Sequence, residues 1–108
     1  MSTNAAPILD PAQLRRRTMG DADMQVEVLS LFVTEVERLL RQIEDAEDAQ
    51  VRGERLRALI VAARDIGATR LAQAARVIET EIAPESPDLT PLRGAVTETL
   101  AYIHRTGA

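Results

Sequence analysis

The chain has no cysteine, no lysine and only one histidine, His104. Without cysteine it can form no disulfide bond, bind no metal through thiolates and use no thiol nucleophile. A single histidine cannot build a histidine metal cluster or a catalytic dyad. We therefore expect no enzymatic activity, no metal site and no cofactor.

Aromatic residues are also scarce, because Phe32 and Tyr102 are the only two. The core must then consist of Leu, Ile, Val and Ala, which suits packing between helices better than packing of a sheet. Hydrophobic residues make up 45% of the 108 residues, so the composition is that of a folded chain. The length corresponds to one domain.

The charge balance is acidic, with a formal net charge of −4 at pH 7. This balance disfavours nucleic acid and anionic membranes as partners. The basic run Arg15 to Arg17 is short and is better explained as the solvated end of a helix. The segment Met1 to Pro7 lacks the apolar stretch of a secretion signal, and no apolar run approaches membrane-spanning length. We expect a cytoplasmic protein.

Apolar residues recur at helical spacing along most of the chain, and no alternating strand pattern occurs. In the segment from Asp21 to about Asp45, the apolar stripe consists of Val28, Phe32, Val36, Leu39 and Ile43, widened by Leu29, Leu31 and Leu40. Similar stripes predict helices over about 49–66, 68–82 and 91–103, preceded by a short helix from Pro11 to near Gly20.

Four residues are predicted to cap helix N-termini, namely Asp10, Asp21, Asp48 and Thr90. Short connections between helices favour antiparallel neighbours. The sequence therefore predicts an all-α protein, an up-down four-helix bundle over residues 9–106 with a short N-terminal capping helix. Residues 1–8 are predicted to form a flexible N-terminal tail.

Several segments, in order along nearly the whole chain, resemble the histidine-containing phosphotransfer (HPt) domain family. The segments Ile8-Leu9-Asp10 and Gly20-Asp21 are similar to the family's N-terminal helix and turn. The apolar pattern of its long second helix is similar to that of Leu29, Leu31 and Phe32. The strongest match is Arg64-Asp65-Ile66-Gly67-Ala68, followed by Leu71-Ala72, Ala75 and Ile78-Glu79. It resembles the family's Asn-(Ile/Leu)-Gly-Ala turn and the Leu-Ala…Leu-Glu helix after it.

This resemblance implies a role in two-component phosphorelay signalling, with response-regulator receiver domains or sensor kinases as partners. Gly67 and Ala68 fix the register of the family's His-x-x-Lys-Gly motif, whose three defining positions fall on Arg57, Ile60 and Val61. A guanidinium has no free lone pair at working pH, so Arg57 cannot accept a phosphoryl group. The resemblance therefore points to a pseudo-phosphotransfer module that binds or modulates receiver domains without carrying phosphate.

Arg57, Val61 and Arg64 are spaced i, i+4 and i+7 and should share one side of a helix. One interpretation is a docking face, with an exposed valine between two arginines that pair with the acidic cluster of a receiver domain. The other is a solvated arginine face with Val61 buried under the N-terminal helix, since scattered surface charges usually have no other role.

Two further functions stay open. One is a structural or dimerisation domain, whose signature is a long exposed apolar stripe; we expect a monomer, with a dimer as the alternative. The other is an atypical phosphotransfer protein that uses His104. Nothing at the family's spacing surrounds this residue, and a histidine near a helix C-terminus also suits the helix dipole.

Overall fold

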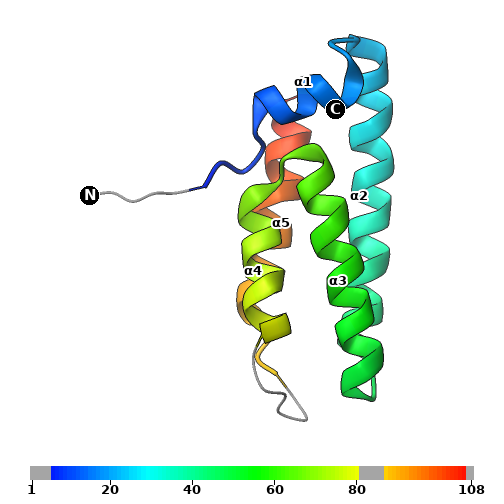
Figure 1. The fold of residues 1–108 in the computed structure, drawn as a ribbon, viewed down its shortest axis with the longest axis vertical. Helices are drawn as coiled ribbons and strands as arrows, with labels where there is room; N and C mark the ends of the chain where they lie inside the picture. The colour runs from blue at the N-terminus through cyan, green and yellow to red at the C-terminus, as the bar shows by residue number, and fades with distance from the viewer. Residues whose placement is uncertain (1–5, 81–86, 107–108) are drawn as a thin grey trace, which may run out of the picture.

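The computed structural model describes residues 6–80 and 87–106, and within these ranges it is helical and contains no strand (Figure 1). The helices in chain order are α1 (Pro11–Thr18), α2 (Ala22–Asp45), α3 (Ala49–Ile66), α4 (Thr69–Thr80) and α5 (Thr90–Arg105). The all-α prediction is confirmed. Most of the predicted tail, and the end of the fourth predicted helix at Ile82, lie outside the described residues.

The four longer helices form a closed ring of neighbours. α2 contacts α3, α3 contacts α4, α4 contacts α5, and α5 returns to contact α2, whereas no diagonal pair is in contact in the described part of the chain. The pair α3 and α4 has the most extensive contact. The short helix α1 lies across one end of α2 and α3 (Figure 1).

The core is almost wholly aliphatic, as the scarcity of aromatic residues requires, and Phe32 is its one buried aromatic among the described residues. Its largest contributions are Leu29, Phe32, Val36, Leu39 and Ile43 of α2; Leu56, Leu59, Ile60 and Ile66 of α3; Leu71 and Ile78 of α4; and Leu92, Val96 and Ile103 of α5. Leu31 is the exception to the predicted stripe. It is 67% exposed and so contributes little to the core.

Aspartates begin three of the helices, as predicted. The carboxylates of Asp10, Asp21 and Asp48 accept backbone N–H groups of the first helical turn at 3.0, 3.0 and 2.8 Å. Each bond satisfies a donor that has no partner within the helix. The helices α1, α2 and α3 therefore all begin at an aspartate N-cap.

The predicted cap at Thr90 is wrong. Thr90 is already the first residue of α5, and the cap position belongs to Leu89, which offers no side-chain acceptor. Instead, Oδ1 of Asp88 accepts the Thr90 N–H at 3.0 Å. This backbone hydrogen bond is the main reason that the pKa of Asp88 is lowered from 3.8, with smaller contributions from the Thr90 side chain and from Arg93.

Gly67 joins α3 to α4 and also receives α1. The N–H groups of Gly67 and Ala68 bond back to Arg64 and Ala63 at 3.2 and 2.8 Å, and Gly67 is left-handed with φ 84°. The Asp10 N–H donates to the Gly67 carbonyl at 2.9 Å. A Cβ at position 67 would lie 2.9 Å from Cβ of Gln13, so α1 can approach only a glycine.

The segment before α1 is hydrogen-bonded to α4. The side-chain Nε of Arg70 donates to the carbonyl of Ala6 at 2.6 Å, and its backbone N–H donates to the carbonyl of Pro7 at 3.3 Å. Arg70 also forms an ion pair with Glu98 of α5 at 2.9 Å. Ala6 and Pro7, which the sequence placed in the tail, are therefore bound to the helices.

Candidate functional site

The three residues predicted to form a docking face are all exposed on α3. The side chain of Arg57 is 71% exposed, Val61 is 62% exposed, and Arg64 is also exposed. Their i, i+4, i+7 spacing within α3 places them on one side of this helix. The interpretation that Val61 is buried under the N-terminal helix is therefore wrong, since α1 covers only the end of α3 beyond it.

Ile60, which the resemblance places at the family's lysine position, does not belong to this exposed side. It is 5% exposed and lies in the core. The three positions that the resemblance assigns to the His-x-x-Lys-Gly motif are thus divided by the helix, with Arg57 and Val61 facing outward and Ile60 facing inward. An isoleucine here stabilises the fold by removing apolar surface from water.

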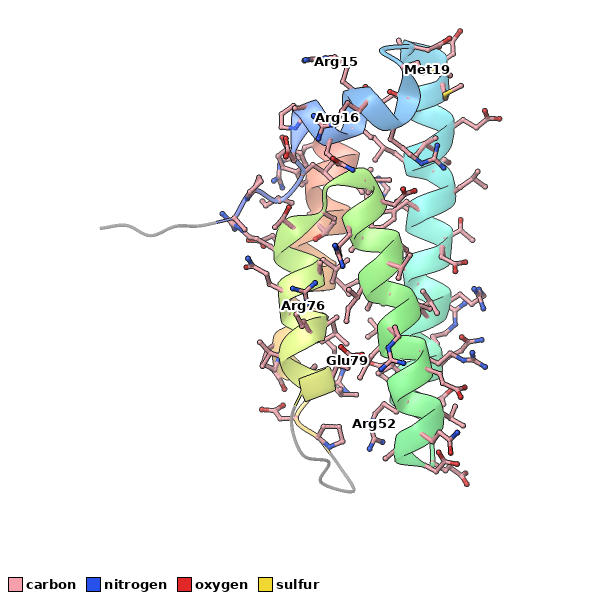
Figure 2. All side chains as sticks on the ribbon, in the orientation of Figure 1. Arg15, Arg16, Met19, Arg52, Arg76 and Glu79 are labelled. Atoms are coloured by element: carbon pink, nitrogen blue, oxygen red, sulfur yellow. The ribbon has the colours of Figure 1, made fainter. Side chains whose placement is uncertain are left out.

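An ion pair connects Arg57 to α4. Its Nε lies 3.0 Å from Oε2 of Glu79, whose side chain is 22% exposed. Figure 2 shows Glu79 on the side of α4 that faces α3, below Arg76. Among the described residues only the Nε of Arg57 is engaged, so most of its guanidinium fork faces solvent.

A polar groove of about 410 Å³ continues this surface between the end of α3 and α4. Arg64 lines it from α3, and Gln73 and Arg76 line it from α4. Arg76 and Gln73 were missed by the sequence reasoning, although the i, i+3, i+6 spacing of Gln73, Arg76 and Glu79 is a detectable signal. We call the surface formed by Arg57, Val61, Arg64, Gln73, Arg76 and Glu79 the arginine face.

The arginine face carries three guanidinium groups against one carboxylate, in a chain of net charge −4. Positive charge is therefore concentrated on the side formed by α3 and α4. Such a surface suits a partner that presents carboxylates or phosphate groups, because complementary charge both steers and orients association.

A second, mainly apolar groove of about 380 Å³ lies between α2 and α3. Val28, Leu31 and Phe32 line it from α2, and Ala62 lines it from α3. An ion pair between Arg17 of α1 and Asp65, with Nε and Oδ2 2.7 Å apart, closes one end. Leu31 is thus an exposed apolar residue beside a hollow, which the sequence did not predict.

The other residues that the sequence singled out have simpler surroundings. His104 is exposed in the last turn of α5, a helix that does not contact α3 in the described part of the chain. Arg15 and Arg16 lie on the exposed surface of α1 (Figure 2), where Arg16 donates to Gln13. Basic residues in the last turn of α1 complement the helix dipole, as predicted.

Across the described ranges, no helix combines the length and the apolarity needed to cross a membrane.

Comparison of the chain with protein-family models, with curated proteins and with solved structures gives no match in any of the three.

Proposed function

We propose that the protein is a pseudo-phosphotransfer module of two-component signalling, built as an HPt-like, up-down four-helix bundle and acting in the cytoplasm. Its role is to bind receiver domains and to sequester or modulate them. The observation that carries the proposal is the exposed stripe of Arg57, Val61 and Arg64 on α3. In the register set by Gly67, this stripe coincides with the surface that bears the phosphorylated histidine in the family it resembles.

The proposed activity is binding rather than chemistry. The side chain at the family's phosphoacceptor position is a permanently protonated guanidinium, which donates hydrogen bonds but has no nucleophilic lone pair. An exposed arginine fork instead pairs well with a carboxylate, often through two parallel hydrogen bonds. Receiver domains present a cluster of carboxylates around their phosphorylatable aspartate, which is the chemistry that Arg57 and Arg64 fit.

The proposal is tested with purified receiver domains encoded in the same genome as this chain. Their affinities are measured by isothermal titration calorimetry for the wild type, for Arg57→Glu and for Arg41→Glu. Arg41 is an exposed arginine of α2 and provides the matched control for a reversed charge away from the arginine face. We expect at least one receiver to bind the wild type and Arg41→Glu while losing most of its affinity for Arg57→Glu. Equal affinities for the two variants, or no binding receiver, would refute the proposal.

The apolar groove beside Leu31 favours one alternative, a helical dimerisation domain. Leu31 is 67% exposed next to this groove, and Val26 on the same helix is 50% exposed. Sedimentation velocity over a hundredfold range of protein concentration tests the alternative. A dimer that Leu31→Asn dissociates would support it, whereas a monomer at every concentration would exclude it.

A further inference from the structure

The groove between the end of α3 and α4 holds two arginines that have no counterion in the described part of the chain. Arg64 comes from the last turn of α3, and Arg76 lies on the exposed side of α4 (Figure 2). Both side chains are exposed, and neither has a carboxylate within ion-pair distance among the described residues. Two positive charges therefore border one hollow, although the chain as a whole is acidic.

The neutral side chains of the groove add hydrogen-bond donors. Oε1 of Gln13 accepts from Arg16 at 2.5 Å, and its Nε2 donates to the Asp65 carbonyl at 3.4 Å. An amide nitrogen has two hydrogens, so Nε2 keeps one for a ligand. Gln73 is exposed and makes no side-chain hydrogen bond among the described residues. The groove is therefore suited to a ligand that accepts several hydrogen bonds.

Asp10 is the one acidic residue in the lining. Its Oδ1 accepts the backbone N–H of Ala12 at 3.0 Å, so this carboxylate is committed to the N-terminus of α1. Even with this negative charge, the charged groups of the lining leave an excess of positive charge. The chemistry of the groove thus favours an anion with more than one acceptor oxygen.

We propose that this groove is a binding site for a phosphate-type oxyanion held between Arg64 and Arg76. A phosphate dianion neutralises two guanidinium groups and offers each a pair of oxygens, whereas a carboxylate has oxygens for one fork. The groove volume of about 410 Å³ leaves room for a phosphate and for the group that carries it. This inference shares Arg64 with the proposed docking stripe, but it requires neither Arg57 nor a protein partner.

The test is a titration of the isotope-labelled protein with inorganic phosphate, followed by two-dimensional ¹H–¹⁵N NMR at constant ionic strength. We expect saturable shifts at the backbone amides of the groove. Arg76→Gln should weaken binding about three- to tenfold, the range expected for an exposed charged hydrogen bond. Arg41→Gln, the matched control on α2, should leave the affinity unchanged. Asp10→Asn, which keeps a capping side chain, should tighten binding by removing the opposing charge.

A second arm identifies the source of the phosphate group. A short neutral peptide carrying one phosphoserine is compared with inorganic phosphate and with the unphosphorylated peptide. Tighter binding of the phosphopeptide indicates a phosphorylated side chain of a protein, and equal binding indicates a free phosphate. Shifts that do not saturate, or equal weakening by Arg76→Gln and Arg41→Gln, would overturn the site. Arg57→Gln should retain phosphate binding, so failure of receiver docking is distinguishable from failure of this site.

Discussion

Gly53, within α3, and Gly67, at its C-terminal end, have opposite structural roles. Gly67 has φ 84°, and an added Cβ would meet the Cβ atoms of Gln13 and Asp10 at 2.9 and 3.0 Å. Gly53 lies within the helix, and nothing lies within 4 Å of the place where its Cβ would be. Gly67 is therefore required by its backbone conformation and by the approach of α1, whereas Gly53 only lowers helix propensity.

We therefore predict opposite effects of the same substitution at these two positions. Gly67→Ala should lower the free energy of unfolding by about 2–4 kcal/mol, from left-handed backbone strain plus the clash with α1. Gly53→Ala should raise it by about 0.5–1 kcal/mol, because alanine is the better helix former. Urea denaturation followed by circular dichroism measures both. Destabilisation by Gly53→Ala, or neutrality of Gly67→Ala, would contradict the geometry of α3.

The lowered pKa of Asp88 predicts how the stability of the fold depends on pH. Its carboxylate accepts the Thr90 N–H, which lowers the pKa in the folded protein from 3.8. Since the folded pKa is below the unfolded one, this group stabilises the fold above pH 3.8, and the contribution is lost as the pH falls through the folded pKa. NMR titration of the Asp88 carboxyl carbon should give a midpoint below 3.8. A midpoint at or above that value would show that the hydrogen bond does not form in solution.

At the scale of the helices, the N-terminal caps show how far the local sequence predicts where a helix begins. Asp10, Asp21 and Asp48 precede helical stripes and bond to the first turn, so local sequence was sufficient for three helix starts. At α5, the proline rule favoured Thr90, but the cap position belongs to Leu89, and the acceptor for the Thr90 N–H is Asp88 one residue before it. Which residue takes the cap position depends on backbone angles that the sequence pattern does not specify.

The caps can be distinguished by mutation. Asp48→Ala should cost about 1 kcal/mol of stability, because the Val51 N–H loses its acceptor. Thr90→Ala should change stability by less than about 0.5 kcal/mol, as expected for an exposed residue that is not the cap. Thermal unfolding of the two variants beside the wild type measures the difference. A larger cost at Thr90 would show that its side chain, which also contributes to the lowered pKa of Asp88, stabilises the start of α5.

The ion pair between Arg57 and Glu79 links α3 to α4 but should contribute little stability. Arg57 is 71% exposed, and exposed pairs of this kind contribute at most about 1 kcal/mol. The free energy of unfolding of Arg57→Gln, measured in urea, should therefore lie within about 1 kcal/mol of the wild-type value. A larger loss would mean that this arginine is part of the framework, and a loss of receiver binding could then be attributed to unfolding.

The candidate site was predictable only in part, for a physical reason. Helical spacing placed Arg57, Val61 and Arg64 together, because three residues on one helix have a fixed relation. Arg76 and Glu79 join them only through the packing of α3 on α4, which the pattern of either helix does not determine. The exposure of Leu31 was missed for the same reason, since it depends on which sides of α2 its neighbours cover.

At the scale of the whole molecule, charge is distributed unevenly. The net charge is −4, yet the charged residues of the arginine face are three arginines and one glutamate. Association with an acidic partner should therefore depend on the orientation of the two molecules and weaken as salt screens the charges. This uneven distribution supports the central claim, which is the proposed binding to the carboxylates of a receiver domain.

The most direct test of that claim is the footprint of a bound receiver domain on this protein, mapped by ¹H–¹⁵N NMR. We predict that the largest shifts fall on the exposed side of α3 around Arg57 and Val61, extend to Glu79 of α4, and diminish as salt is raised. Shifts confined to the groove beside Leu31, or spread evenly over α2 and α5, would contradict the account.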